Sequence, residues 1–309
     1  WWLPTLIAVS AFAAAQAGIY HNAMFRTFFG ISMACATPKL VFSLVDLVLG
    51  STIAIIVAVS LIAAIAYGVM YGWRRIVVRT ASCRSSRLPS AFHGYRILQL
   101  SDIHIGTFLQ NPKFITKLVE AVNRQQPDLV VFTGDLINTD AHELLPFRKV
   151  LSQIRAKDGV LSVMGNHDYC EYSQDAAQPI HGRRELHAHR SRRLLEYLQE
   201  KMGWRMLMNE NVMLQRGSDS IAIIGVENIG KPPFKSFGNL DKAMTGLPAD
   251  CFKVLLSHDP THWRRGVLNK TDISLTLSGH THAGQVKIGR FSPAKWAYNE
   301  WGGKYTEGS

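Results

Sequence analysis

The chain has 309 residues, of which 47% are hydrophobic, and a formal net charge of +11. This length allows one large or two modest domains, and the charge favours anionic partners such as phosphate esters, lipid headgroups or nucleic acid. The four cysteines, Cys35, Cys83, Cys170 and Cys251, form no CxxC pair. That pattern excludes a disulfide framework and is typical of a reducing compartment.

The first part of the chain is apolar. Residues 47–70 carry no charge, and as a helix they would extend about 36 Å, which exceeds the bilayer core of about 30 Å. Residues 3–20 are a second, alanine-rich candidate, preceded by Trp1 and Trp2, which are suited to a membrane interface. They also look like the apolar core of a signal peptide, but a cleaved signal would leave 47–70 unexplained. We therefore expect two transmembrane helices within residues 1–72.

Basic residues follow the second apolar stretch directly. We interpret residues 73–94, which are rich in arginine and serine, as a basic juxtamembrane linker. Positive charge beside a span is typical of the cytoplasmic side of a membrane. The sequence therefore predicts a multi-pass protein of the cell membrane whose larger domain faces the cytoplasm. The arginines are Arg74, Arg75, Arg79, Arg84 and Arg87.

The larger domain, residues 95–309, reads as an alternation of strands and helices. Short apolar runs predict strands, and longer stretches with helical periodicity lie between them. This alternation indicates an α/β domain of packed layers. The expected strands are 96–100, 128–132, 159–164, 221–226, 252–257 and 272–277, and the expected helices are 112–125 and 142–156.

Polar motifs follow five of these strands. They are "SDIH" at 101–104, "TGDL" at 133–136, "GNHD" at 165–168, "HDP" at 258–260 and "SGHTH" at 278–282. Each motif alone is compatible with an ordinary turn. Five in succession, each after a strand, are not, because the carboxyl ends of strands are where sites gather in α/β sheets.

Seven of these side chains are candidate metal ligands with nitrogen or oxygen donors. Seven donors are too many for a tetrahedral structural zinc, and no cysteine is among them. They suit two divalent ions about 3.5–4 Å apart with one bridging carboxylate. Mixed carboxylate and imidazole donors favour Mn, Fe or Zn over calcium or magnesium. The candidates are Asp102, His104, Asp135, Asn166, His258, His280 and His282.

This set of motifs, in this order and spacing, resembles the calcineurin-like metallophosphoesterase superfamily. The segments "LSHDP" and "GHTHAGQ" are similar to sequences of its membrane-associated bacterial phosphodiesterase branch, which includes UDP-2,3-diacylglucosamine pyrophosphatases. The resemblance covers residues 96–309 and implies a four-layer αββα sandwich. Family members usually continue past a segment like "WGGKYTEGS" with a closing strand, so we expect the domain to be truncated at its C-terminal end.

The resemblance also implies a role for each motif residue. Asp102, His104 and His282 would hold one metal, and Asn166, His258 and His280 the other, with Asp135 bridging. His167 would contact the phosphate and protonate the leaving group, and Asp168 would orient the His167 imidazole. A metal-activated hydroxide would attack in line, and an imidazole is a suitable acid for the leaving oxygen.

An arginine- and histidine-rich segment, 178–204, has two interpretations. It is either the solvated face of a helix over 183–202, or a cap over the site in which Arg183, Arg184 and Arg190 bind a second phosphate or an anionic lipid.

Three function classes remain open. The first is a membrane-anchored phosphodiesterase or pyrophosphatase acting on a lipid-linked substrate, and the second a tethered metallophosphatase acting on a soluble nucleotide or phosphoprotein. The third is a non-catalytic scaffold. The complete ligand set and His167 argue against the scaffold, and the apolar spans favour the lipid-linked phosphoester. No nucleic-acid partner is expected.

Overall fold

The structure is a computed structural model, and it describes residues 5–6, 9–10, 13, 32–109, 111–170, 183–232, 235–285, 287 and 291–307. The chain forms two compact units, Trp1–Val78 and Arg79–Ser309.

The first unit contains two described helices, α3 (Thr37–Leu49) and α4 (Ser51–Met70), after a π-helical turn at Ser32–Ala36. Gly50 separates the two helices with a φ of 81°, a conformation that glycine adopts at little cost. The predicted span at 47–70 therefore begins too early, because residues 47–49 belong to α3. Most of the other predicted span, 3–20, lies outside the described residues.

Helix α4 is long and apolar enough to cross a membrane. Only 6% of its window Ser51–Gly68 is buried, and Ile56 and Val59 are about 60% exposed. The core helix of a soluble protein would be mostly buried. Within the described part of the chain, α4 is the one candidate span.

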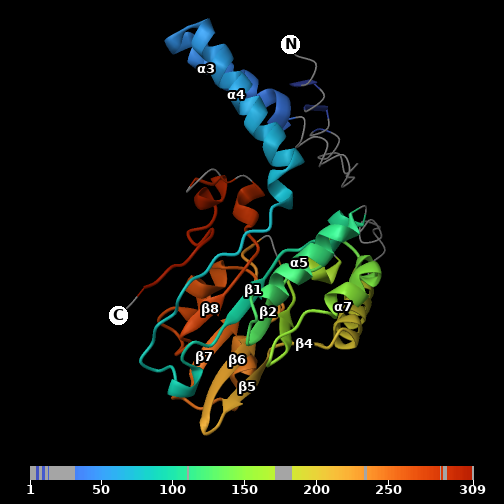
Figure 1. Ribbon diagram of the computed structural model, residues 1–309, viewed down its shortest axis with the longest axis vertical. Coiled ribbons are helices and arrows are strands. Elements are labelled where there is room, and N and C mark those ends of the chain that lie inside the picture. Colours follow the sequence, from blue (N-terminus) through green and yellow to red (C-terminus); the bar gives the residue numbers. More distant parts are fainter. Residues whose placement is uncertain are drawn as a thin grey trace. The chain divides into compact units, whose positions relative to one another are not determined.

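The second unit is built on two four-stranded sheets (Figure 1). The first sheet is parallel throughout, in the order β1 (Ile97–Leu100), β2 (Leu129–Thr133), β3 (Val160–Val163) and β4 (Trp204–Met206). The second is mixed, with β5 (Glu210–Arg216) antiparallel to β6 (Asp219–Gly225), and then β7 (Phe252–Leu256) and β8 (Leu275–Leu277) parallel to β6.

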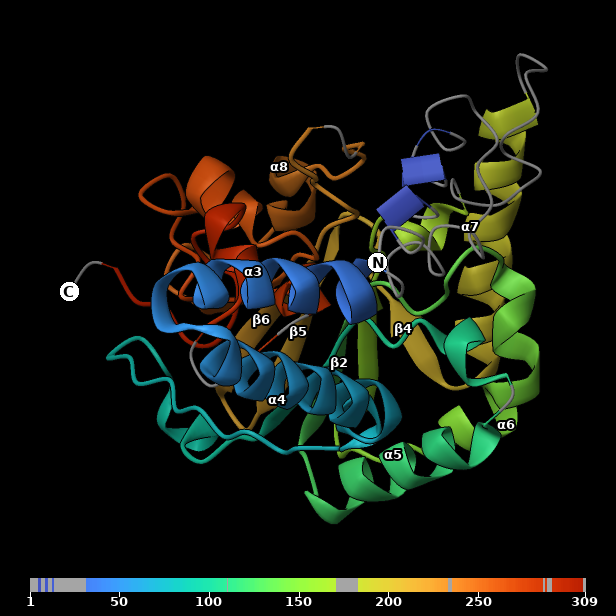
Figure 2. The same ribbon diagram turned by 90° about the horizontal axis from the view of Figure 1, so that it is seen from above.

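The sheets pack face to face, and helices cover their outer sides. Alternate residues of β2 show the layering: Val130 and Phe132 pack under the helices α5 (Pro112–Arg124) and α7 (Arg183–Lys201), whereas Leu129 and Val131 pack against the second sheet. Helix α8 (Leu240–Met244) and the π-helical turn Trp263–Val267 cover the second sheet from outside. Figure 2 shows α5 and α7 on one side of the sheets and α8 on the other. The order of layers is therefore αββα, as the resemblance implies.

Several predicted elements differ from the structure. The predicted helix 142–156 is a 3-10 helix, Ala141–Phe147, followed by the single turn α6 (Arg148–Leu151). Pro146 lies inside this stretch and lacks the N–H group that a continuous α-helix needs. Strands β4 and β5 were not predicted, although the two-residue turn between β5 and β6, with Gly217 at a φ of 61°, is a hairpin signal.

The basic linker is also shorter than predicted. The Arg87 guanidinium donates to the backbone carbonyls of Ala249, Cys251 and Asp272, and Phe92 is 1% exposed within the core between the sheets. Residues 87–94 are therefore part of the second unit.

Candidate metal centre

All seven predicted ligands lie at the carboxyl ends of strands. Asp102 and His104 follow β1, Asp135 follows β2, Asn166 follows β3, His258 follows β7, and His280 and His282 follow β8. Five of the seven adopt a positive φ, between 47° and 72°. For residues other than glycine this conformation costs on the order of 1–3 kcal/mol each. Backbone strain collected in one set of loops is typical of a functional site.

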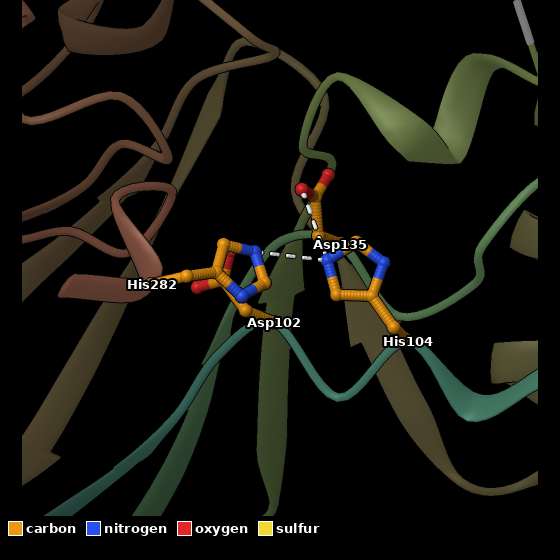
Figure 3. Close-up of side chains that lie close together, drawn as sticks. All are labelled: Asp102, His104, Asp135 and His282. Atoms are coloured by element: carbon orange, nitrogen blue, oxygen red, sulfur yellow. Dashed lines mark hydrogen bonds and ion pairs between the residues drawn. The ribbon is translucent and has the colours of Figure 1, made fainter. Parts of the chain in front are cut away.

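The first group of side chains contains Asp102, His104, Asp135 and His282 (Figure 3). The Nε2 atoms of His104 and His282 are 3.0 Å apart. The His282 Nε2 atom also lies 3.1 Å from Asp102 Oδ1, and the His104 Nε2 atom lies 3.6 Å from Asp135 Oδ2. Figure 3 shows that these side chains come from three separate loops and point toward one another. His282 is exposed, so this group is accessible to solvent.

The second group contains Asp135 again, with His258, His280 and Asn166. The His258 Nε2 atom lies 3.2 Å from Asp135 Oδ2, from Asn166 Oδ1 and from His280 Nδ1. The other ring nitrogen of His258 donates to the Thr133 carbonyl at 2.8 Å, which directs Nε2 into the group. His258 is fully buried, so this group is the more enclosed of the two.

Asp135 belongs to both groups, and its two carboxylate oxygens have different partners. Its Oδ1 atom accepts the backbone N–H of His167 at 2.9 Å. Its Oδ2 atom faces both His104 and His258. A single oxygen shared between two sets of donors is the arrangement that a carboxylate bridging two ions requires.

Two glycines let the loops approach this closely. A Cβ atom on Gly134 would lie 2.6 Å from His258 Nδ1, and one on Gly165 would lie 2.7 Å from His258 Cε1 and would overlap the Asp135 carboxylate. Because both distances are shorter than a van der Waals contact, any larger residue would displace His258 or Asp135. The glycines of "TGDL" and "GNHD" are therefore part of the site.

Charges within the site compensate one another. Burial alone would raise the pKa of Asp135, but the His258 imidazole and its neighbours lower that pKa well below its usual range. Burial alone would lower the pKa of His258, but Asp135 outweighs it and raises the pKa to about 10. In the first group, burial lowers the pKa of His104 to about 4. Burial alone would also lower the pKa of His282, but its hydrogen bond to Asp102 and the charge of that carboxylate raise the pKa overall. The imidazoles of His258 and His282 thus stabilise the charged forms of Asp135 and Asp102.

The donor set fits divalent ions of the first transition series. Two imidazole nitrogens 3.0 Å apart have the spacing of two ligands on one ion, since metal–nitrogen bonds are about 2.1 Å long. The donors are nitrogen and oxygen atoms in mixed groups, which suits Mn, Fe or Zn.

His167 lies beside the first group. Its ring is perpendicular to that of His104, with the ring centroids 4.6 Å apart. Its Nδ1 atom is 2.7 Å from the Asn138 carbonyl. A carbonyl only accepts, so Nδ1 carries a proton and Nε2 is the ring nitrogen that is suited to exchange a proton with a ligand.

Asp168 does not have the predicted role of orienting His167. Its buried carboxylate instead accepts the backbone N–H groups of Gly165, Asp135, Leu136 and Ile137, at 2.8–3.2 Å. Burial and the nearby Asp135 carboxylate raise the pKa of Asp168 to about 7, and the hydrogen bonds from the Gly165 and Ile137 N–H groups counter only part of that rise. Asp168 therefore fixes the loop that carries Asp135, while the Asn138 carbonyl holds the His167 ring. Adjacency in sequence was a misleading guide here.

Tyr298 is a site residue that the sequence did not indicate. Its hydroxyl lies 3.0 Å from His280 Nε2. It comes from the segment 291–301, which follows the last recognised motif and contains no motif of its own. A lone tyrosine in an irregular segment carries no spacing signal that would have identified it.

Helix α7 packs beside the short turn His167–Tyr169. Leu195 and Leu198 are buried on the first sheet, and Arg192 forms an ion pair with the buried Glu227 at 3.1 Å. Of the three predicted substrate-binding arginines, Arg190 is exposed. The side chains of Arg183 and Arg184, at the start of α7, lie outside the described part of the chain.

Comparison with known proteins agrees with this geometry. The sequence profile described as "Calcineurin-like phosphoesterase" matches residues 95–284, which include the strands β1 to β8 and all seven candidate ligands. The chain belongs to the calcineurin-like phosphoesterase family.

Relatives within this family come from animals and bacteria. The chain is 32% identical over 218 residues to a bovine "Transmembrane protein with metallophosphoesterase domain", covering 68% of this chain and 45% of the relative. It is 30% identical over 261 residues to the "Uncharacterized metallophosphoesterase YkuE" of Bacillus subtilis, covering 79% of each. It is 27% identical over 240 residues to the "UDP-2,3-diacylglucosamine pyrophosphatase LpxG" of Chlamydia muridarum, covering 65% of this chain and 68% of the relative. The chain thus spans less than half the length of the bovine relative.

Proposed function

We propose that this chain is a metal-dependent phosphoesterase that cleaves a phosphodiester or pyrophosphate bond. The observation that carries the proposal is the single oxygen, Asp135 Oδ2, shared between two groups of imidazole and carboxylate donors. Asp102, His104 and His282 would hold one divalent ion, and Asn166, His258 and His280 the other. Two ions bound there would neutralise phosphate oxygens and lower the pKa of water.

Protonation of the leaving oxygen is assigned to His167. The Asn138 carbonyl fixes its Nδ1 proton, so Nε2 is the atom that passes a proton to the leaving oxygen when the ring is protonated. The His167 backbone N–H also holds Asp135 Oδ1, so the acid and the bridging ligand are positioned by one short turn, His167–Tyr169.

The experiment is a metal-dependence assay on the full chain. Protein stripped of metal and reloaded with Mn²⁺ should hydrolyse a chromogenic diester such as bis(4-nitrophenyl) phosphate, and the stripped protein should not. Hydrolysis that is equal with and without metal, or that is absent for diesters, monoesters and pyrophosphates alike, would contradict the proposal.

We further propose that the enzyme is anchored in a membrane, with its catalytic unit on the cytoplasmic side, and that its substrate is lipid-linked. The exposed apolar surface of α4 supports an anchor, and the arginines that follow it support the orientation. Two relatives, from Bos taurus and Danio rerio, are named transmembrane proteins. A third relative, from Chlamydia muridarum, is named for a pyrophosphatase activity on a diacylated sugar nucleotide. A tether concentrates an enzyme at the surface where a lipid substrate lies, and offers a soluble substrate nothing comparable.

The arginines of α7 provide the test of the substrate class. We expect the triple variant Arg183→Ala, Arg184→Ala, Arg190→Ala to lose on the order of 10-fold or more in kcat/KM on a lipid-linked pyrophosphate and to keep its rate on the chromogenic diester. The matched control removes three exposed charges from α5, through Lys113→Ala, Lys117→Ala and Arg124→Ala. Equal rates for wild type and the α7 variant on both substrates would favour a soluble substrate and a merely solvated helix.

A further inference from the structure

The segment 291–301 is fastened to the loop of His280 and His282. The Ser292 hydroxyl donates to the Ala283 carbonyl at 2.5 Å, and the Thr281 hydroxyl donates to the Trp301 carbonyl at 2.7 Å. Ser292 is fully buried. Glu300 in the same segment accepts from Arg264 at 2.5 Å, which ties it to the π-helical turn beside β7. These contacts hold the segment on both sides of Tyr298.

Tyr298 contacts His280 on the side of the ring that faces away from the second group. The Tyr298 hydroxyl is 3.0 Å from His280 Nε2, and the two rings are nearly perpendicular, at 81°. The opposite nitrogen, Nδ1, lies 3.2 Å from His258 Nε2. The backbone N–H of His280 is also fixed, because it donates to both oxygens of Asp102 at 3.0 Å. His280 thus has one nitrogen directed inward and the other directed at a phenol.

These contacts determine which tautomer of His280 is useful. A neutral imidazole has one nitrogen that donates and one that accepts. If the phenol accepts from Nε2–H, the lone pair of Nδ1 points into the second group, where a metal ligand needs it. If the proton were on Nδ1, that lone pair would be lost. Outer partners of this kind commonly fix the tautomer of a ligating histidine.

We propose that Tyr298 is a positioning residue for the second metal, acting through its hydrogen bond to His280 and not by touching the metal or the substrate. The proposal rests on the metal groups of the proposed function. It extends the functional unit of the chain beyond the recognised motifs, to a residue 18 positions after His280.

The test compares two Tyr→Phe variants of the full chain. Tyr298→Phe removes the hydroxyl that contacts His280. Tyr305→Phe is the matched control, because the Tyr305 hydroxyl bonds only within its own turn, to the backbone of Gly302, among the contacts of the described residues. Each stripped protein is titrated with Mn²⁺ against a competing chelator, and the thermal midpoint of the metal-free protein checks the fold.

We expect Tyr298→Phe to bind one ion like wild type and the other about 10–100-fold more weakly. Nitrogen-15 NMR of the His280 ring gives a second readout, since the proton should reside on Nε2 in wild type and distribute over both nitrogens in the variant. Tyr305→Phe should match wild type in both measurements. Unchanged affinity for both ions in Tyr298→Phe, or an equal loss in Tyr305→Phe, would overturn the proposal. A wild-type chain that binds two ions but cleaves no phosphoester would instead contradict the proposed function. The ion affinities of Tyr298→Phe and wild type would still decide whether Tyr298 positions the second metal.

Discussion

Two buried aspartates flank the strand β2, and their surroundings are opposite. Asp128 precedes the strand and Asp135 follows it, with 5% and 1% of their surfaces exposed. Asp128 has dedicated partners: Lys157 at 2.7 Å, Arg216 at 3.1 Å and the Arg96 backbone N–H at 2.8 Å. Asp135 has no Lys or Arg partner among the described residues, and its carboxylate instead faces two imidazoles, those of His104 and His258.

The difference separates a structural edge of the sheets from a functional one. We call the edge where the amino end of β2 lies the amino edge. There, Arg216 of β5 forms an ion pair with Asp128 beside β2 and lies over the Tyr95 ring, so the charges join the two sheets. At the carboxyl edge, the loops carry positive φ angles and donors that converge on shared points. Carboxylates that have dedicated Lys or Arg partners stabilise a fold, whereas donors that converge on a common centre are arranged for a ligand. Substitutions at the two edges should therefore have different consequences.

The largest expected effect is that of Asp135→Ala on activity. Because Asp135 Oδ2 faces both groups, its loss should remove more than one ion per chain and lower turnover on the order of 10³-fold or more. Metal analysis after reconstitution with Mn²⁺ and a diester assay would measure both. Asp128→Ala is the control from the other end of the same strand: it should keep two ions and wild-type turnover while the free energy of unfolding falls. A similar metal content in both variants would remove the distinction between the two edges.

The next effect, on the order of 10²-fold, is that of His167→Ala on turnover. The variant should retain both ions, because the His167 backbone N–H that holds Asp135 is unchanged. The loss should be smaller for substrates with a nitrophenol leaving group, which needs little protonation, than for those with an alkyl alcohol. Equal losses for good and poor leaving groups would argue against a role as an acid.

The sequence predicted the carboxyl edge better than the rest of the molecule. Ligands such as His280 and His282 stand out because polar residues directly after apolar strands are unusual and recur in a fixed order. The residues that hold the ligands and their loops in place carry no such pattern. Tyr298 contacts His280 from an irregular segment, and Asp168 accepts hydrogen bonds from a loop more than 30 positions away in the chain. Pairing between distant segments depends on tertiary packing, which local periodicity does not encode. The same reason explains why the short edge strand β4 was missed.

The smallest expected effect is that of Asp128, at the amino edge, on how the free energy of unfolding changes in acid. Asp128 is buried, which alone would raise its pKa, but Lys157, the Arg96 N–H and Arg216 outweigh this and lower the pKa to about 2. Because the folded value is below the unfolded value of about 3.9, the stabilisation is fully present above pH 4 and is lost as the pH falls toward 2. We expect Asp128→Asn to be less stable than wild type by about 2 kcal/mol at pH 6, with the gap closing near pH 2. Denaturant unfolding at several pH values would measure it. A gap that stays constant from pH 6 to pH 2 would mean that Asp128 stabilises the sheets by packing and not by its charge.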